Sequence, residues 1–162
     1  MQYIDSNLDP WQAAGGEDAS AAPFPPAPNL LLDVAQWRSL RADWPAELPV
    51  GLKLQNDADV EDIAADLPRF ALIALHFPKW TDGRAYSQAH LLRARYRFSG
   101  QVRATGDVVV DMLPLLQRSG FDAVALRADQ SVDAAKRALE FFPSYYQGDV
   151  LVTRPHFGRV AA

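Results

Sequence analysis

A dense group of side chains that could transfer protons or bind anions follows one apolar run of the sequence. The segment "LHFPKWTDGRAYSQAHLLR" (75–93) brings His76, Lys79, Asp82 and Arg84 into a short stretch before an apolar pattern of helical spacing. Lysine and arginine donate charge-assisted hydrogen bonds to oxyanions, and a lysine or aspartate with a shifted pKa can transfer a proton. We therefore expect a site at a strand-to-helix turn, with Lys79, Asp82 and Arg84 as candidate catalytic groups.

The elements that must position these side chains alternate between strand and helix patterns. Helical apolar spacing recurs around residues 60–67, 85–96, 111–119 and 135–142, between short apolar runs. Parallel neighbouring strands need such crossover connections. We predict a single α/β domain of four to five mainly parallel strands alternating with helices, resembling half of a βα barrel, with an open doubly wound sheet as the alternative. The predicted strands are 50–54, 70–77, 101–105 and 121–127.

Proline and glycine give the third predicted helix two possible starts and one end. A start at Asp107 would leave Pro114 deep inside the helix, where proline is costly. A start at Asp111 would leave it in the first turn, where its missing N–H matters less. The sequence leaves both starts open, and Gly120 suits the residue just after the helix.

The ends of the chain differ in composition from its middle. Residues 12–29 are rich in alanine, glycine and proline and show no apolar period, which is typical of a surface linker. The predicted organisation is an N-terminal extension and linker over 1–29, an α/β domain over 30–150, and a C-terminal tail over 151–162.

Composition excludes several classes of function. The 162 residues carry a net charge of −4, which argues against general nucleic-acid binding. No apolar stretch is long enough to span a bilayer, and the first residues do not resemble a signal peptide, so we expect a cytoplasmic protein without membrane contact. The absence of cysteine excludes thiol chemistry within the chain, and no histidine pair has metal-ligand spacing.

The carboxyl ends of the predicted strands gather cationic side chains. These ends carry Lys53, then His76 with Lys79, then Arg103, then Arg127, and ligands of parallel α/β sheets bind at this edge. Residues 79–103 contain six Lys or Arg against one acid, in a chain that is acidic overall. We predict a small oxyanion as the ligand. The candidate ligand-binding residues are His76, Ser87, Arg93, Arg103, Gly106 and Asp107.

Two of the acids also suit structural roles. Asp82 and Asp107 precede predicted helices and could cap them. Arg84 follows at a helix start, where a positive charge opposes the helix dipole, so we expect a partner for it, either a bound anion or a carboxylate such as Asp107. No GxGxxG, Walker or nucleophile-elbow motif occurs, so the cofactor, and whether the protein is an enzyme, stay open.

A specific residue pattern runs from the strand end at Phe77 to Asp122, with one tryptophan upstream of it. Its residues are Trp37, Phe77, Pro78, Lys79, Thr81, Asp82, Gly83, Arg84, Tyr86, Ser87, Leu92, Arg93, Arg95, Tyr96, Gly100, Arg103, Ala104, Gly106, Asp107, Gly120, Phe121 and Asp122. The segment that carries this pattern is similar to a bacterial family of unknown biochemical function with an oxidoreductase label connected with sulfite reduction, and genes of that family commonly lie beside assimilatory sulfite reductase. The similarity covers about residues 30–147, and the chain departs from the pattern at His76, where relatives often have aspartate, and at Pro114.

This resemblance implies an accessory protein of assimilatory sulfate or sulfite reduction that binds an anion or sulfur intermediate at the strand ends. Its implied partner is sulfite reductase or another sulfur-assimilation enzyme. The alternative is a non-catalytic scaffold that docks on sulfite reductase through exposed Tyr86, Arg93 and Arg97. A half-barrel would leave sheet edges open, so a homodimer is a further possibility.

Overall fold

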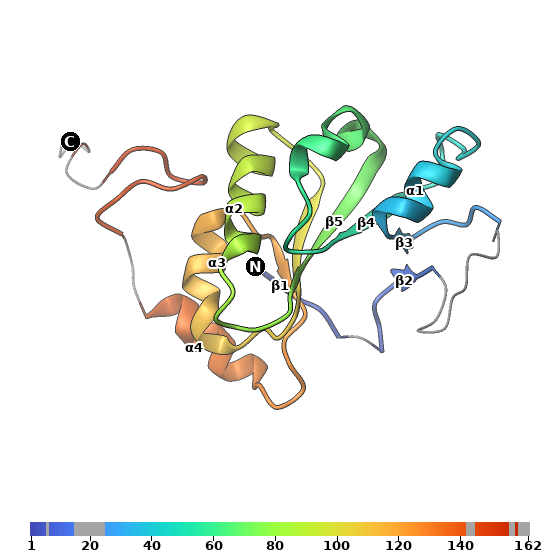
Figure 1. The fold of residues 1–162 in the computed structure, drawn as a ribbon. Coiled ribbons are helices and arrows are strands. Elements are labelled where there is room, and N and C mark those ends of the chain that lie inside the picture. The colour runs from blue at the N-terminus through green and yellow to red at the C-terminus, as the bar shows by residue number, and fades with distance from the viewer. Residues whose placement is uncertain (6, 15–24, 142–144, 156–157, 159–162) are drawn as a thin grey trace.

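The computed structural model describes residues 1–5, 7–14, 25–141, 145–155 and 158, and its centre is a curled parallel sheet (Figure 1). The strands follow the order β1-β7-β6-β5-β4-β3-β2, and every pairing between neighbours is parallel. The predicted half-barrel-like α/β fold is therefore confirmed, although the sheet has seven strands where four to five were predicted. The strands are β1 (Gln2–Tyr3), β2 (Gln12–Ala13), β3 (Leu30–Leu32), β4 (Val50–Leu54), β5 (Phe70–Phe77), β6 (Gln101–Gly106) and β7 (Ala123–Val124).

Short helices connect these strands, and α2, α3 and α4 lie together on one side of the sheet in Figure 1. The connection before β5 is a 3-10 helix, and α2 continues into a π-helical turn, η2. None of the helices in the described residues combines the length and apolar character needed to cross a bilayer. The helices are α1 (Val34–Leu40), η1 (Val60–Arg69), α2 (Arg84–His90), η2 (Leu91–Arg95), η3 (Val110–Met112), α3 (Leu113–Ser119) and α4 (Val132–Glu140).

Local sequence signals explain several helix boundaries. The Asp33 carboxylate accepts a hydrogen bond from the Gln36 N–H, and the Gln36 side-chain oxygen accepts one from the Asp33 N–H, which closes a capping box at the start of α1. The helix α3 starts at Leu113, so Pro114 lies in its first turn, as the later of the two possible starts requires. Gly120 follows α3 with φ of 101°, a conformation that glycine adopts without steric penalty. The predicted strand 121–127 is shorter than expected, because only its residues in β7 pair with neighbouring strands.

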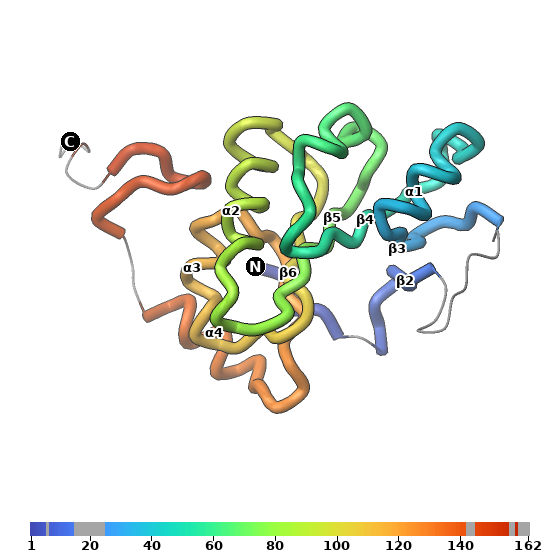
Figure 2. Tube along the Cα trace, viewed as in Figure 1, coloured from blue at the N-terminus to red at the C-terminus, as the bar shows by residue number. Residues whose placement is uncertain are grey.

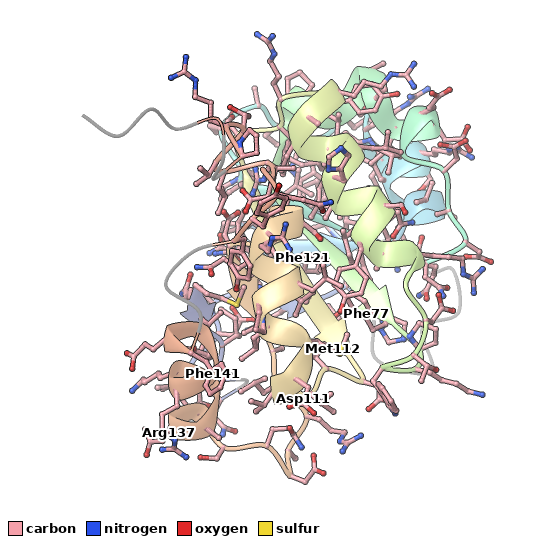
Figure 3. The ribbon with its side chains drawn as sticks, turned by 90° about the vertical axis from the view of Figure 1, so that its left-hand side faces the viewer. Phe77, Asp111, Met112, Phe121, Arg137 and Phe141 are labelled. Carbon is pink, nitrogen blue, oxygen red and sulfur yellow. The ribbon has the colours of Figure 1, made fainter. Side chains whose placement is uncertain are left out.

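One face of the sheet packs against the helices and forms the main core. Side chains alternate between the two faces of a strand, and Ile73, Leu75 and Phe77 of β5 are buried on the helix side. The Phe77 ring lies 5.9 Å from the ring of Phe121, between the sheet and the helices α2 and α3 (Figure 3). Burying rings of this size supplies much of the apolar stabilisation of a small domain.

The opposite face of the sheet, here called the inner face, carries the alternate residues. Gly51, Leu72, Ala74 and Ala123 are buried there, although they lie outside the core on the helix side. Residues 1–5 and 7–14 are here called the N-terminal strap, and Asp9 and Trp11 of this strap contact the inner face at Arg103 and Gly51.

The N-terminal strap joins the two edges of the sheet. β1 pairs with β7 at one edge, and β2 pairs with β3 at the other. Figure 2 shows the blue trace of the strap leading from the N-terminus to β2, on the other side of the sheet. Residues 2–3 and 12–13, placed by the sequence in an extension outside the domain, therefore belong to its sheet. Most of the predicted linker, residues 15–24, lies outside the described residues.

A buried ion pair fastens the N-terminal strap to the inner face. Arg103 is only 3% exposed and forms an ion pair with Asp9. Its guanidinium also donates to the Gln101 side-chain oxygen at 3.1 and 2.9 Å. Gln101 lies on the same face, one pleat nearer the amino end of β6, so the guanidinium points away from the carboxyl ends of the strands. The ring of Trp11 packs over Gly51 at this end of the sheet.

Candidate functional site

The turn between β5 and α2 is organised around the Asp82 carboxylate. One oxygen accepts hydrogen bonds from the Arg84 backbone N–H at 3.2 Å and from Arg84 Nε at 3.1 Å. The other accepts from Arg84 Nη2 at 2.8 Å and from Asn56 Nδ2, in the loop after β4, at 2.7 Å. Arg84 therefore has a carboxylate partner, which was one of the two expected alternatives, but that partner is Asp82, two residues away, and not Asp107. The cap position of α2 is Gly83 rather than Asp82.

A second carboxylate, Asp107, joins the next loops of the same edge. It accepts a hydrogen bond from the Trp80 backbone N–H at 3.0 Å and one from Arg127 Nη1 at 2.7 Å. Arg127 also donates to both oxygens of Asp129, at 2.6 and 2.7 Å. The loops after β5, β6 and β7 are thereby connected. Asp107 does not cap a helix, because η3 begins only after Val109.

The loop after β4 is fastened from α2 as well. Gln88 is buried, and its Nε2 donates to the backbone oxygens of Gln55 and Ala58, each at 2.8 Å. Together with the bond between Asn56 and Asp82, these contacts hold this loop against the turn that begins α2. Much of the charge that marks this region in the sequence therefore fixes loops in place.

The shared hydrogen bonds keep these carboxylates ionised. Bonds from Arg84, first through its side chain and then through its backbone, lower the pKa of Asp82 to about 2. The Arg127 side chain lowers the pKa of Asp129 to about 2. The pKa of Asp107 is also lowered, first by the Trp80 N–H and then by Arg127. At neutral pH these groups are acceptors for ion pairs and are poor proton donors.

Acidification should loosen this edge of the molecule before it unfolds the core. A carboxylate with a lowered pKa stabilises the folded loops above its unfolded pKa of about 3.9, and this stabilisation disappears as the pH falls through the folded value. We expect the amide resonance of Arg84 to shift between about pH 4 and pH 2, and that of Trp80 to shift as the pH falls below about 3.9. Nitrogen–proton NMR spectra measure this, and Asp107→Asn should abolish the Trp80 transition alone. Unchanged amide shifts down to the pKa of Asp82 would contradict the role given to these carboxylates.

Two basic side chains at the same edge keep their hydrogen-bonding groups available. Lys53 and His76 lie on the inner face at the ends of β4 and β5. Lys53 pairs with Ala74, and His76 follows Ala74 by two residues, on the same face of β5. Within the described residues, the Lys53 ammonium has no ion pair and the His76 ring makes no hydrogen bond. Burial, and then the positive charge of Lys53, lower the pKa of His76, so its ring is neutral at pH 7.

A glycine makes room for the His76 ring. Gly106 ends β6 with φ of 91°, and a Cβ there would lie 2.7 Å from His76 Cε1 and 2.8 Å from His76 Nδ1. The neighbouring Thr105 hydroxyl donates to the Leu75 backbone oxygen at 3.3 Å. Gly106, one of the predicted binding residues, therefore positions His76.

The remaining predicted residues are divided between different surroundings. Lys79 and Ser87 are exposed, Lys79 in the turn and Ser87 on α2. Arg93 forms an ion pair with Asp122 and donates to the backbone oxygens of Gly120 and Gly100, at 3.0 and 2.9 Å. It therefore holds η2 against the turns around it, and its predicted exposure is wrong. Arg103 lies under the N-terminal strap, so the structure does not bring its guanidinium to Lys79 and Arg84.

The sequence analysis placed Lys53 at the end of a predicted strand but did not include it among the candidate site residues. The sequence pattern around Lys53 is weak evidence for a binding role, because a single lysine in "VGLKL" is equally compatible with any exposed strand position. Its place beside His76 depends on the pairing of β4 with β5, which the sequence does not state.

In the described residues, no cluster of three or more histidine, cysteine, aspartate or glutamate side chains could hold a metal ion.

Comparison with known families and proteins places this chain. A search of curated proteins found no match. A family model described as "Bacterial protein of unknown function (DUF934)" matches residues 51–157, which contain β4 to β7 and the loops at their carboxyl ends. Because this match covers well over half of the sequence, the chain belongs to that bacterial family of unknown function.

Proposed function

We propose that this protein is an accessory protein of assimilatory sulfite reduction that binds a small oxyanion or sulfur intermediate at the carboxyl ends of β4 and β5. The observation that carries the binding proposal is the neighbouring placement of Lys53 and His76, without a carboxylate partner in the described residues. The sulfur-assimilation context is supported by the resemblance of the central motif, from Phe77 to Asp122, to the sulfite-reduction family.

Each group at this edge has a defined part in the proposed binding. The Lys53 ammonium attracts the anion and donates hydrogen bonds to its oxygens. His76 supplies a further polar contact from a ring held beside Gly106. Lys79 is exposed in the same turn as Arg84, and it forms no ion pair in the described residues. Asp82 and Arg84 serve by holding the turn.

Removing the Lys53 charge should weaken anion binding. We expect Lys53→Met to reduce the affinity for sulfite by about tenfold or more, the effect of one charge-assisted hydrogen bond. Isothermal titration calorimetry under nitrogen measures this. Lys136→Met is the matched control, because Lys136 lies on α4, exposed, beside Asp133. If sulfite does not bind the unmodified protein at millimolar concentration, the proposed site is wrong.

The same variants test the proposed role in the cell. Growth on sulfate as the only sulfur source should be impaired by Lys53→Met and unaffected by Lys136→Met at equal protein abundance. Normal growth with Lys53→Met, combined with lost sulfite binding in vitro, would separate the anion site from sulfur assimilation.

One observation favours the alternative function, a scaffold that docks on sulfite reductase. Trp80 is 57% exposed, and its backbone N–H donates to the Asp107 carboxylate. Exposed tryptophan residues often dominate binding between proteins. Tyr86 and Arg93, predicted for this surface, instead pack inside: Tyr86 contacts Phe77, and Arg93 bonds to backbone oxygens.

A binding experiment decides between the functions. If the scaffold proposal is right, the tagged protein should capture sulfite reductase, and Trp80→Ala should abolish this capture. Leu115→Ala, on the exposed side of α3, is the control for loss of an exposed apolar side chain. Capture that survives Trp80→Ala would argue against docking through this turn.

A further inference from the structure

Arg103 and Lys53 lie in one row across the inner face, on either side of Ala74. Lys53 of β4 pairs with Ala74 of β5, and Ala74 pairs with Arg103 of β6. Neighbouring strands are about 4.8 Å apart, so the Cα atoms of the two basic residues are separated by about 10 Å. Ala74 carries only a methyl group, so the two long side chains can reach over it towards one another. The strand register therefore places a second cation close to the proposed anion site.

The Arg103 guanidinium already binds a carboxylate of the same chain. Its Nη1 donates to Asp9 of the strap, and its Nε and Nη2 donate to the Gln101 side-chain oxygen. A carboxylate and a small oxyanion offer a guanidinium the same kind of acceptor, a negatively charged oxygen. Lys53 is exposed and forms no ion pair in the described residues. Of the two cations in this row, one therefore carries an internal anion and the other is available.

A second contact holds the strap on the same face. A Cβ on Gly51 would lie 3.0 Å from Trp11 Cζ3, so the Trp11 ring packs against β4 two residues before Lys53. Because Asp9 contacts β6 and Trp11 contacts β4, the strap passes over β5 between these two contacts. The strands at the two ends of the strap, β1 and β2, are only two residues long. Short pairings of this kind open more readily than the long strands of a core.

We infer that Arg103 is a second cation of the anion site, occupied in this structure by Asp9, and that an oxyanion bound between Lys53 and Arg103 releases the strap. The inference rests on the proposed anion site and concerns its regulation. Asp9 acts as an internal competitor of the ligand, so the closed strap keeps the site at low affinity.

The exchange of one anion for the other leaves no buried charge unpaired. The Asp9 carboxylate leaves with the strap and becomes hydrated, while an oxygen of the ligand takes its place on Arg103. The guanidinium, which in the closed strap points towards Gln101, turns on its flexible side chain towards Ala74. The ligand gains the Arg103 contact only in the released state, and this difference in contacts shifts the equilibrium of the strap. Weakening the strap must therefore strengthen ligand binding, and ligand binding must loosen the strap.

Removing the competing charge should strengthen binding. We expect Asp9→Asn to increase the affinity for sulfite by about tenfold or more, measured by titration calorimetry of the full chain under nitrogen. Asp5→Asn is the matched control, because it makes the same change of charge in the same strap, at an exposed residue whose carboxylate accepts from the Asn7 N–H. Its affinity should stay within about twofold of that of the unmodified protein, because exposed charges are screened.

Two further variants separate the strap from the charge. Trp11→Ala loosens the strap without a change of charge and should also strengthen sulfite binding. Arg103→Met combined with Asp9→Leu removes the second cation together with its competitor. This double variant should bind sulfite no more tightly than the unmodified protein, because Lys53 is then the remaining cation of the row.

Hydrogen exchange measures the strap itself. The N–H groups of Gln12 and Ala14 donate to the backbone oxygens of Asn29 and Leu31, at 3.0 and 2.9 Å. Saturating sulfite should accelerate the exchange of both amides in the unmodified protein. In Asp9→Asn the exchange should be fast without ligand, and in Lys53→Met the same sulfite concentration should leave it slow.

The outcomes distinguish this inference from the proposed function. Sulfite binding that needs Lys53 but is equally tight in the unmodified protein, Asp9→Asn and Trp11→Ala would keep the anion site and overturn the role of the strap. Unchanged exchange of the Gln12 and Ala14 amides at saturating sulfite would also overturn that role. No sulfite binding by the unmodified protein would overturn the anion site, and this inference with it.

Discussion

Arg103→Ala should lower the free energy of unfolding by about 3–5 kcal/mol, the range measured when one partner of a buried ion pair is removed. The change leaves the Asp9 carboxylate, whose side chain is 12% exposed, without its cation and leaves the Gln101 side-chain oxygen without its donors. It also releases the N-terminal strap from the inner face. Urea denaturation followed by circular dichroism measures the difference.

An exposed ion pair provides the control. Arg95 and Glu61 pair across η2 and η1 with side chains 60% and 53% exposed, so Arg95→Ala should change stability by about 0–1 kcal/mol. Replacing both buried partners, as Arg103→Met with Asp9→Leu, should recover most of the lost stability, because no uncompensated charge remains. If Arg103→Ala unfolds at the same urea concentration as Arg95→Ala, the ion pair does not fasten the strap.

Gly106→Ala should destabilise the protein by at least about 2 kcal/mol and displace His76. The positive φ of 91° costs a residue with a side chain about 1–3 kcal/mol. The added Cβ would also lie 2.3 Å from the Phe77 backbone oxygen and within 3 Å of the His76 ring, which requires a further shift of well-packed groups. Thermal denaturation measures the stability, and the His76 ring resonances report its displacement.

Gly83 is the matched control for this substitution. Its φ is −84°, and a Cβ there would lie no closer than 3.8 Å to Tyr86, which is ordinary contact. Gly83→Ala should therefore change stability by less than about 0.5–1 kcal/mol. A Gly106→Ala protein as stable as Gly83→Ala, with unmoved His76 resonances, would show that the strand end adapts without strain.

The sequence by itself determined the elements whose causes are local. The run from Phe70 to Phe77 is apolar apart from His76, because both faces of the middle of β5 are buried. Gly120 ends α3 through its own backbone preference, and Pro114 limits the start of that helix to a position that leaves the proline in the first turn. These features need no knowledge of distant contacts, which is why pattern and propensity were sufficient.

Only the tertiary structure decided which charged side chains remain free. The sequence grouped Arg84, Arg93 and Arg103 as one cationic surface, but each found a different partner when strands and loops came together. The partner of Arg103 is Asp9, a residue 94 positions away on a strap whose two-residue strands have no detectable period. Ion-pair partners depend on strand order and on which face each side chain occupies, and these are fixed by burial of the whole sheet. Lys53 and His76 are left available for the same reason, since the pairing of β4 with β5 brings them together while their neighbours are already paired.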